Sequence, residues 1–139
     1  MTSKDDARMF QKLIIISAWA SILALAFATL THIGFVYSIY YKLAPLLMRP
    51  GMRLYVHIEH VIAFAVFGAL FAFAYPRRLM FVCSIVFISA VALEYLQNMT
   101  PDRHGTLVDA FEKVVGGAFG ILAAYAILWF TQSRRRFQN

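Results

Sequence analysis

The uncharged stretch LIIISAWASILALAFATLTHIGFVYSIYY, residues 13–41, decides the fold class of this chain. It contains no aspartate, glutamate, lysine or arginine. As one helix it would be about 43 Å long, which exceeds the ~30 Å hydrocarbon core of a bilayer. The stretch therefore predicts a membrane-spanning helix that tilts, protrudes or stops near Gly34.

The composition of the whole chain supports a membrane protein. Of its 139 residues, 61% are hydrophobic and 14% are charged, whereas a soluble domain is about half apolar and a quarter charged. The net charge is +6, but the basic residues lie in short clusters between and beyond apolar runs, as membrane topology requires. We therefore expect membrane lipids as surroundings and no nucleic-acid partner. No phosphate loop or dinucleotide pattern is present, so no cofactor is predicted.

Three further apolar runs follow the first one. The turn at residues 76–78 is so short that the runs on either side of it must be antiparallel neighbours, whereas residues 42–56 and 99–106 are predicted loops. The sequence thus predicts an all-α integral membrane four-helix bundle. Its parts are a polar N-terminal segment (1–12), a transmembrane domain (13–133) with later spans at 58–75, 79–98 and 107–133, and a basic tail (134–139).

Lysine and arginine positions predict the orientation of the bundle. With a cytoplasmic N-terminus, the inner side would hold Lys4, Arg8, Lys12, Arg77, Arg78, Arg134, Arg135 and Arg136. The outer side would hold Lys42, Arg49, Arg53, Arg103 and Lys113. The excess of basic residues inside predicts that both termini are cytoplasmic, in a membrane that we take to be the bacterial inner membrane.

Polar and ionisable residues collect at the predicted extracytoplasmic end of the last three spans. They are Glu59, His60, Glu94, Gln97, Arg103, Asp109, Glu112 and Lys113. Charges at membrane depth are expensive, so such residues tend to face the bundle and to pair. Glu94 and Gln97 are three apart and share a helix face, while Asp109 and Lys113 are four apart and can pair directly. The sequence leaves open whether Asp109 pairs with Lys113 or Glu94 with Arg103.

A stripe of small residues continues from these charges along the last span. Asp109, Lys113, Gly116 and Gly120 fall on one helix face, and the Gly116-x-x-x-Gly120 step lets a neighbouring helix approach closely. We expect this packing to carry Asp109 toward the acidic and histidine side chains of the other spans.

The pattern of these residues resembles the VanZ-like membrane proteins, a family named for a teicoplanin-resistance protein. The resemblance covers roughly residues 57–120 and rests on Glu59-His60, Ala63, Phe64, Gly68, Glu94-x-x-Gln97, Pro101, Arg103, Asp109, Gly116 and Gly120. It implies a helical protein of the cell envelope that contributes to glycopeptide antibiotic resistance. Lys113 is a departure, since the family often has asparagine there, and Val56-His57 stand where it often has Asp-Lys.

Two interpretations of the polar residues remain open. In the first, they bind an anionic or glycan-linked lipid, with Arg103 and Lys113 meeting phosphate or carboxylate groups. In the second, they form a buried ion-pair network that locks three helices together.

Other functions are less favoured by the sequence. The chain can be a non-catalytic accessory subunit of a larger membrane complex, given its small size. A lipid-headgroup hydrolase or transferase would use paired carboxylates and a histidine, but no nucleophile pattern is visible and no enzymatic activity is predicted. No metal site is predicted either, because no ligand set is complete among His57, Glu59, His60, Glu94 and Asp109.

Overall fold

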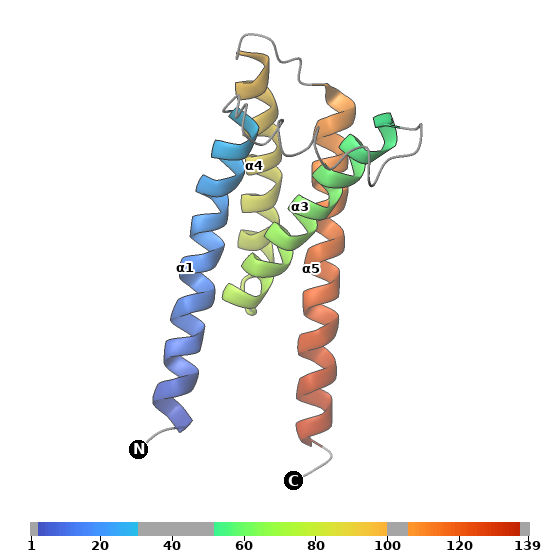
Figure 1. Cartoon of the computed structure of the whole chain (residues 1–139). Helices are drawn as coiled ribbons and strands as arrows, with labels where there is room; N and C mark the ends of the chain where they lie inside the picture. Colours follow the sequence, from blue (N-terminus) through green and yellow to red (C-terminus); the bar gives the residue numbers. More distant parts are fainter. Residues whose placement is uncertain (1–2, 31–51, 100–105, 137–139) are drawn as a thin grey trace.

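The computed structural model describes residues 3–30, 52–99 and 106–136. Within these ranges all regular secondary structure is helical, which confirms the predicted all-α class. The described residues form four helices, and Figure 1 shows the N- and C-termini at the same end of the molecule. The helices are α1 (Ser3–Leu30), α3 (Met52–Ala74), α4 (Leu79–Asn98) and α5 (Leu107–Arg136).

Three of the helices are long and apolar enough to cross a membrane. The candidate spans are Asp5–Leu30 in α1, Leu79–Asn98 in α4 and Leu107–Arg134 in α5. In α3 the apolar part of the described chain, Glu59–Ala74, is shorter, and this helix runs obliquely across the others (Figure 1). Three of the four predicted spans are therefore helices of the length and composition that a membrane crossing requires.

Three helix boundaries differ from those predicted. Helix α1 begins at Ser3, within the predicted polar segment, because Asp5 and Asp6 in its first turn suit the positive end of the helix dipole. Helix α3 begins at Met52, so the predicted loop is wrong for residues 52–56, because helix-breaking residues that precede a helix do not interrupt it. Helix α5 continues to Arg136, into the predicted basic tail.

A tight turn joins α3 to α4, and α1 packs against it. The backbone N–H of Arg78 donates to the carbonyl of Tyr75 at 3.0 Å, as in a β-turn. From α1, the Gln11 side chain donates to the Ala74 carbonyl at 2.8 Å, and the Trp19 indole donates to the Tyr75 hydroxyl at 2.8 Å. The bonds from Arg78 and Gln11 satisfy carbonyl groups of the kind that a helix C-terminus leaves free.

The core lies on α3, which has its most extensive contact with α5 and also packs on α1 and α4. Phe64, Phe67 and Phe71 of α3 are almost fully buried. Their rings meet edge to face, with centroids 5.6 Å and 5.0 Å apart, a favoured aromatic geometry. Within the described chain, α1 and α5 do not touch each other.

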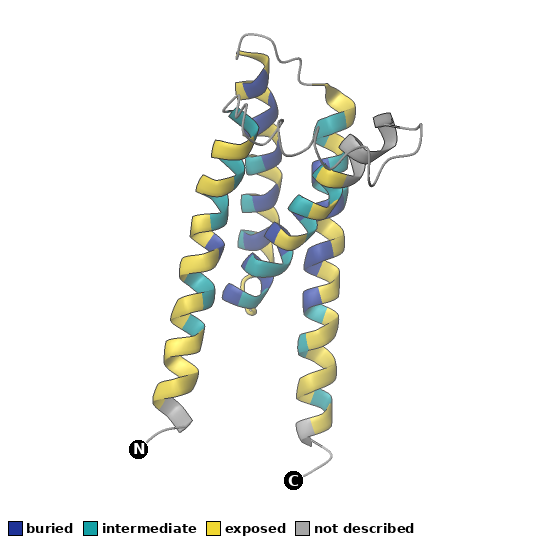
Figure 2. Cartoon of the chain, in the orientation of Figure 1, coloured by how far each residue is buried: buried dark blue, intermediate teal, exposed yellow. Residues whose placement is uncertain are grey.

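The outer faces of the helices are apolar and exposed, as Figure 2 shows by their yellow colour. Large side chains such as Leu23, Phe119 and Trp129 lie among them. A water-soluble monomer rarely exposes so much contiguous apolar surface, whereas a lipid-facing surface requires it. The burial pattern therefore agrees with a helical membrane protein.

Glycines set the distance between α3 and α5. A Cβ atom at Gly116 would collide with the backbone carbonyl of Val61, and one at Gly120 with that of Ala65. From the other side, a Cβ atom at Gly68 would collide with the carbonyl of Gly117. The two backbones thus touch along this stripe, and no larger residue fits without moving a helix.

We expect Gly120→Ala to destabilise the bundle by about 1–3 kcal/mol, because the added methyl group overpacks a backbone contact. Helix propensity alone predicts the opposite sign, since alanine is favoured over glycine by about 1 kcal/mol. Thermal unfolding in mild detergent measures the change. Ala118→Val, which adds bulk on the exposed face of α5, is the control and should melt as wild type does. A Gly120→Ala protein as stable as wild type would contradict the close contact.

Candidate functional site

The centre of the polar cluster is a lysine with no exposed surface. Lys113 of α5 has a relative exposure of 0%. Its ammonium group forms a salt bridge with the Oε2 atom of Glu94 and donates to the Oε1 atom of Gln97 at 2.9 Å. Because a buried lysine charge is strongly unfavourable without a partner, the two α4 side chains are what allow Lys113 to lie inside the bundle.

Helix periodicity explains why Glu94 and Gln97 point inward. The buried face of α4 begins with Val82 and continues through Val86 and Ala90 at four-residue steps. Glu94 is the next position on that face and Gln97 follows three residues later. Both are only 6% exposed. The apolar packing of α4 therefore also aims its carboxylate and amide at Lys113.

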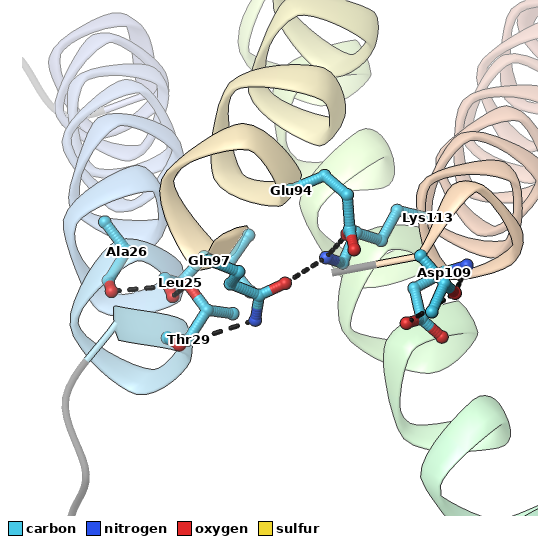
Figure 3. A network of polar contacts seen from close by, with 8 residues as sticks. Leu25, Ala26, Thr29, Glu94, Gln97, Asp109 and Lys113 are labelled. Carbon is cyan, nitrogen blue, oxygen red and sulfur yellow. Dashed lines mark hydrogen bonds and ion pairs between the residues drawn. The ribbon is translucent and has the colours of Figure 1, made fainter. Parts of the chain in front are cut away.

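The network continues from α4 to α1. The Gln97 Nε2 atom donates to the backbone carbonyl of Thr29 at 3.4 Å, and the Thr29 hydroxyl donates to the carbonyl of Leu25 at 2.6 Å. Figure 3 shows these contacts as a chain from α1 through Gln97 to Lys113 and Glu94. One end of the bundle thus has a polar connection between α1, α4 and α5.

One carboxylate oxygen of this network has no hydrogen-bond partner among the described residues. It is the Oε1 atom of Glu94, which is buried. Buried polar atoms are satisfied in the great majority of cases, so this oxygen marks a place where a water molecule or a ligand group would be held.

A second group of ionisable side chains lies between α3 and α5. His60 of α3 and the carboxylates of Asp109 and Glu112 of α5 offer ligand atoms that all lie within 4.8 Å of one another. All three side chains are half-buried. Asp109 and Glu112 are three residues apart, so they share a face of the first turns of α5. Lys113, Asp109, Glu112 and Glu94 all act electrostatically on His60, which links the two groups.

Thr106 fixes both the start of α5 and the orientation of Asp109. The backbone N–H of Asp109 donates to the Thr106 hydroxyl oxygen at 3.2 Å, which is the usual geometry of a helix N-cap. The Thr106 hydroxyl in turn donates to the Oδ2 atom of Asp109 at 2.8 Å. The aspartate is therefore oriented by a hydrogen bond before any ligand arrives.

The structure brings most of the sequence-predicted residues together and separates a few. Glu94, Gln97 and Lys113 form one group, and His60 with Asp109 forms the other. Glu59 is exposed. Arg103 lies outside the described residues, as does the His57 side chain. The structure shows a salt bridge between Lys113 and Glu94, a pairing that neither of the two alternatives left open by the sequence contained.

Two contributing residues, Thr106 and Thr29, were missed by the sequence analysis. Glu112 was counted in the polar cluster but not as a possible metal ligand, although its spacing of three residues from Asp109 was the available signal. Thr106 precedes Asp109 by three residues, the spacing of a helix cap. Thr29 contributes through its backbone carbonyl, for which a sequence carries no signal.

Comparison of the chain with protein-family models, with curated proteins and with solved structures finds no match. The resemblance to the VanZ-like proteins therefore stands on the residue pattern alone.

We expect Glu94→Gln to destabilise the protein by about 3–5 kcal/mol, because it leaves the Lys113 ammonium buried without a counter-charge. The double variant Glu94→Gln with Lys113→Gln removes both charges and should recover most of that loss. Thermal unfolding in detergent measures both, and Glu59→Gln, which alters an exposed carboxylate, is the control. A double variant no more stable than Glu94→Gln would show that the ion pair is not what the structure depends on.

Proposed function

We propose that this chain is a VanZ-like protein of the bacterial inner membrane whose polar end binds the headgroup of an anionic or glycan-linked lipid. The observation that carries the proposal is the convergence of ionisable side chains from α3, α4 and α5 at one end of an otherwise apolar bundle. Ionisable groups within a membrane domain are costly and are functional by default. The VanZ-like residue pattern, which falls on these same positions, supports the assignment.

The available side chains suit such a headgroup chemically. Asp109 and Glu112 are half-buried carboxylates, which accept hydrogen bonds from sugar hydroxyl groups. Arg103 precedes the Thr106 cap by three residues in the sequence, and a guanidinium group can bind a phosphate with two parallel hydrogen bonds. The positive charge of Lys113 is already neutralised by its salt bridge with Glu94. We therefore assign phosphate binding to Arg103 rather than to Lys113.

The arrangement of the termini supports an extracytoplasmic site. Both termini lie at the end of the molecule opposite the last turn of α4 and the first turn of α5 (Figure 1). The terminal segments hold six of the eight basic residues counted as inner from the sequence, from Lys4 to Arg136. The positive-inside rule then favours a cytoplasmic location for the termini and an outer location for the polar end.

A binding site of this kind would act on lipid-linked envelope precursors. The VanZ-like pattern carries the further suggestion that such binding contributes to resistance against glycopeptide antibiotics. No nucleophile pattern accompanies the carboxylates, so we propose a binding role and not an enzymatic one.

A different observation favours a second function, that of a non-catalytic accessory subunit. In the Lys113–Glu94–Gln97 network the carboxylate balances the charge of the ammonium group, and Gln97 connects the pair to α1 through Thr29. Such a network can serve to lock helices in a rigid bundle that a larger membrane complex then recruits. In that case the polar end would stabilise the fold and would hold no lipid.

Native mass spectrometry of the protein, extracted in mild detergent from its own membranes, separates these functions. We expect a small particle that carries a discrete anionic or glycan-bearing lipid. Arg103→Gln should weaken lipid binding at least tenfold and so lower the lipid occupancy, because a charge-assisted hydrogen bond contributes roughly 1.5–3 kcal/mol and each ~1.4 kcal/mol is a factor of ten in affinity. Arg134→Gln, at the other end of the bundle, is the matched control. A large assembly without such a lipid would favour the accessory subunit instead.

The proposed orientation has its own test, by cysteine labelling in a Cys83→Ala background. Leu107→Cys lies at the exposed start of α5 and Gln132→Cys near its end. On intact spheroplasts, a membrane-impermeant maleimide should label position 107 and leave position 132 unlabelled until the membrane is opened. The reverse pattern would place the polar end in the cytoplasm.

A further inference from the structure

We propose that His60, Asp109 and Glu112 bind one divalent transition-metal ion of the Zn²⁺ or Mn²⁺ type. The sequence analysis did not predict this site. It considered His60 and Asp109 as metal ligands but not Glu112. The structure brings one imidazole from α3 and two carboxylates from α5 to a single point beside the buried ion pair.

The distances fit a shared ion. The three ligand atoms lie within 4.8 Å of one another. Nitrogen and oxygen ligands of zinc sit roughly 2.0–2.2 Å from the metal, so two ligands of one ion are at most about 4.4 Å apart. The three side chains would therefore have to draw closer together by rotation for one ion to meet all of them.

The histidine provides an observation independent of the carboxylates. The Nδ1 atom of His60 is buried, yet it finds no hydrogen-bond partner in the part of the chain that the structure describes. A buried nitrogen of this kind carries a desolvation penalty. The Nδ1 atom of His60 is therefore available as a ligand atom. Neutral imidazole is the commonest nitrogen ligand for metals in proteins.

The surroundings of the three ligands resemble those of metal sites generally. The Thr106 hydroxyl donates to Asp109 Oδ2 at 2.8 Å, and hydrogen bonds of this type orient ligating carboxylates. The close approach of α3 and α5 fixes the relative positions of the ligands, because a Cβ atom at Gly116 would collide with Val61, the residue after His60. The site therefore rests on two rigid helices.

The ligand types indicate which metals would bind. Two carboxylates supply two negative charges, which match a divalent cation, and a mixed set of one nitrogen and two oxygen ligands suits Zn²⁺, Mn²⁺ or Fe²⁺. Three protein ligands leave at least one coordination position open, as in sites where a metal meets a water molecule or a substrate. In this chain the open position would accept a phosphate oxygen of the lipid headgroup, and this last step rests on the proposed function.

The binding test uses the full chain without a histidine tag, purified in detergent and freed of metal with EDTA. Titration with Mn²⁺, followed by the loss of the free-ion electron paramagnetic resonance signal, and titration with Zn²⁺ by calorimetry should each give one equivalent per chain. Glu112→Gln and His60→Ala should weaken binding at least tenfold, and Zn²⁺ should raise the melting temperature of wild type only. Glu59→Gln removes the exposed carboxylate beside His60 and should bind as wild type does.

Two results would overturn the metal site. One is that the wild-type chain shows no saturable metal binding near one equivalent. This test uses the wild-type protein alone, so it does not depend on whether a variant folds. The other is undiminished binding by Glu112→Gln with a wild-type melting temperature in the metal-free state.

Native mass spectrometry with and without EDTA keeps this inference distinct from the proposed function. Lipid that leaves with EDTA and returns with Zn²⁺ would support both together. Metal binding without a discrete lipid would support the metal site and contradict the lipid-binding function. A retained lipid with no metal binding would contradict the metal site and leave the lipid-binding function in place.

Discussion

An ammonium group without any exposed surface constrains the polar end of this bundle. Lys113 lies inside only because Glu94 and Gln97 meet its charge and its hydrogen-bonding needs. Those two residues belong to the same face of α4 that packs Ala90 and the apolar positions before it. Helix α4 therefore cannot rotate about its axis without breaking both the ion pair and the core. Gln97 extends the same constraint to α1 through the Thr29 carbonyl.

The glycine stripe of α5 and the buried lysine depend on each other. Lys113 stands one turn before Gly116, on the face that lies against α3. Contact between the backbones of α3 and α5 leaves no room for side chains along the glycine stripe. The Lys113 side chain, which comes directly before the stripe, is therefore buried where this contact ends. The same close approach brings His60, next to Val61, alongside Glu112, which is four residues before Gly116. Packing in the apolar part of the bundle thus determines which polar groups meet at its end.

The sequence predicts the helical class, the apolar spans and the shared face of two α4 residues because each depends on local periodicity. It does not predict which acid neutralises Lys113. Asp109, four residues away on the same helix, was as suitable as Glu94 on another helix, and only the packing of α4 on α5 distinguishes them. Glu112 was overlooked as a ligand for a similar reason. Its proximity to His60 depends on the register of α3 against α5, which side-chain spacing within one helix does not contain.

The balance of charge at the polar end limits what can bind there. The Lys113–Glu94 pair is neutral as a unit, so the nearby carboxylates of Asp109 and Glu112 give this end an acidic character. Acidic groups attract sugar hydroxyls and cations but repel phosphate. An anionic headgroup therefore needs an added positive charge, from the Arg103 guanidinium or from a divalent cation on the two carboxylates. Lys113 therefore stabilises the fold and does not bind the headgroup. Whether Arg103 or a bound divalent cation supplies the added positive charge determines how an anionic headgroup would be bound.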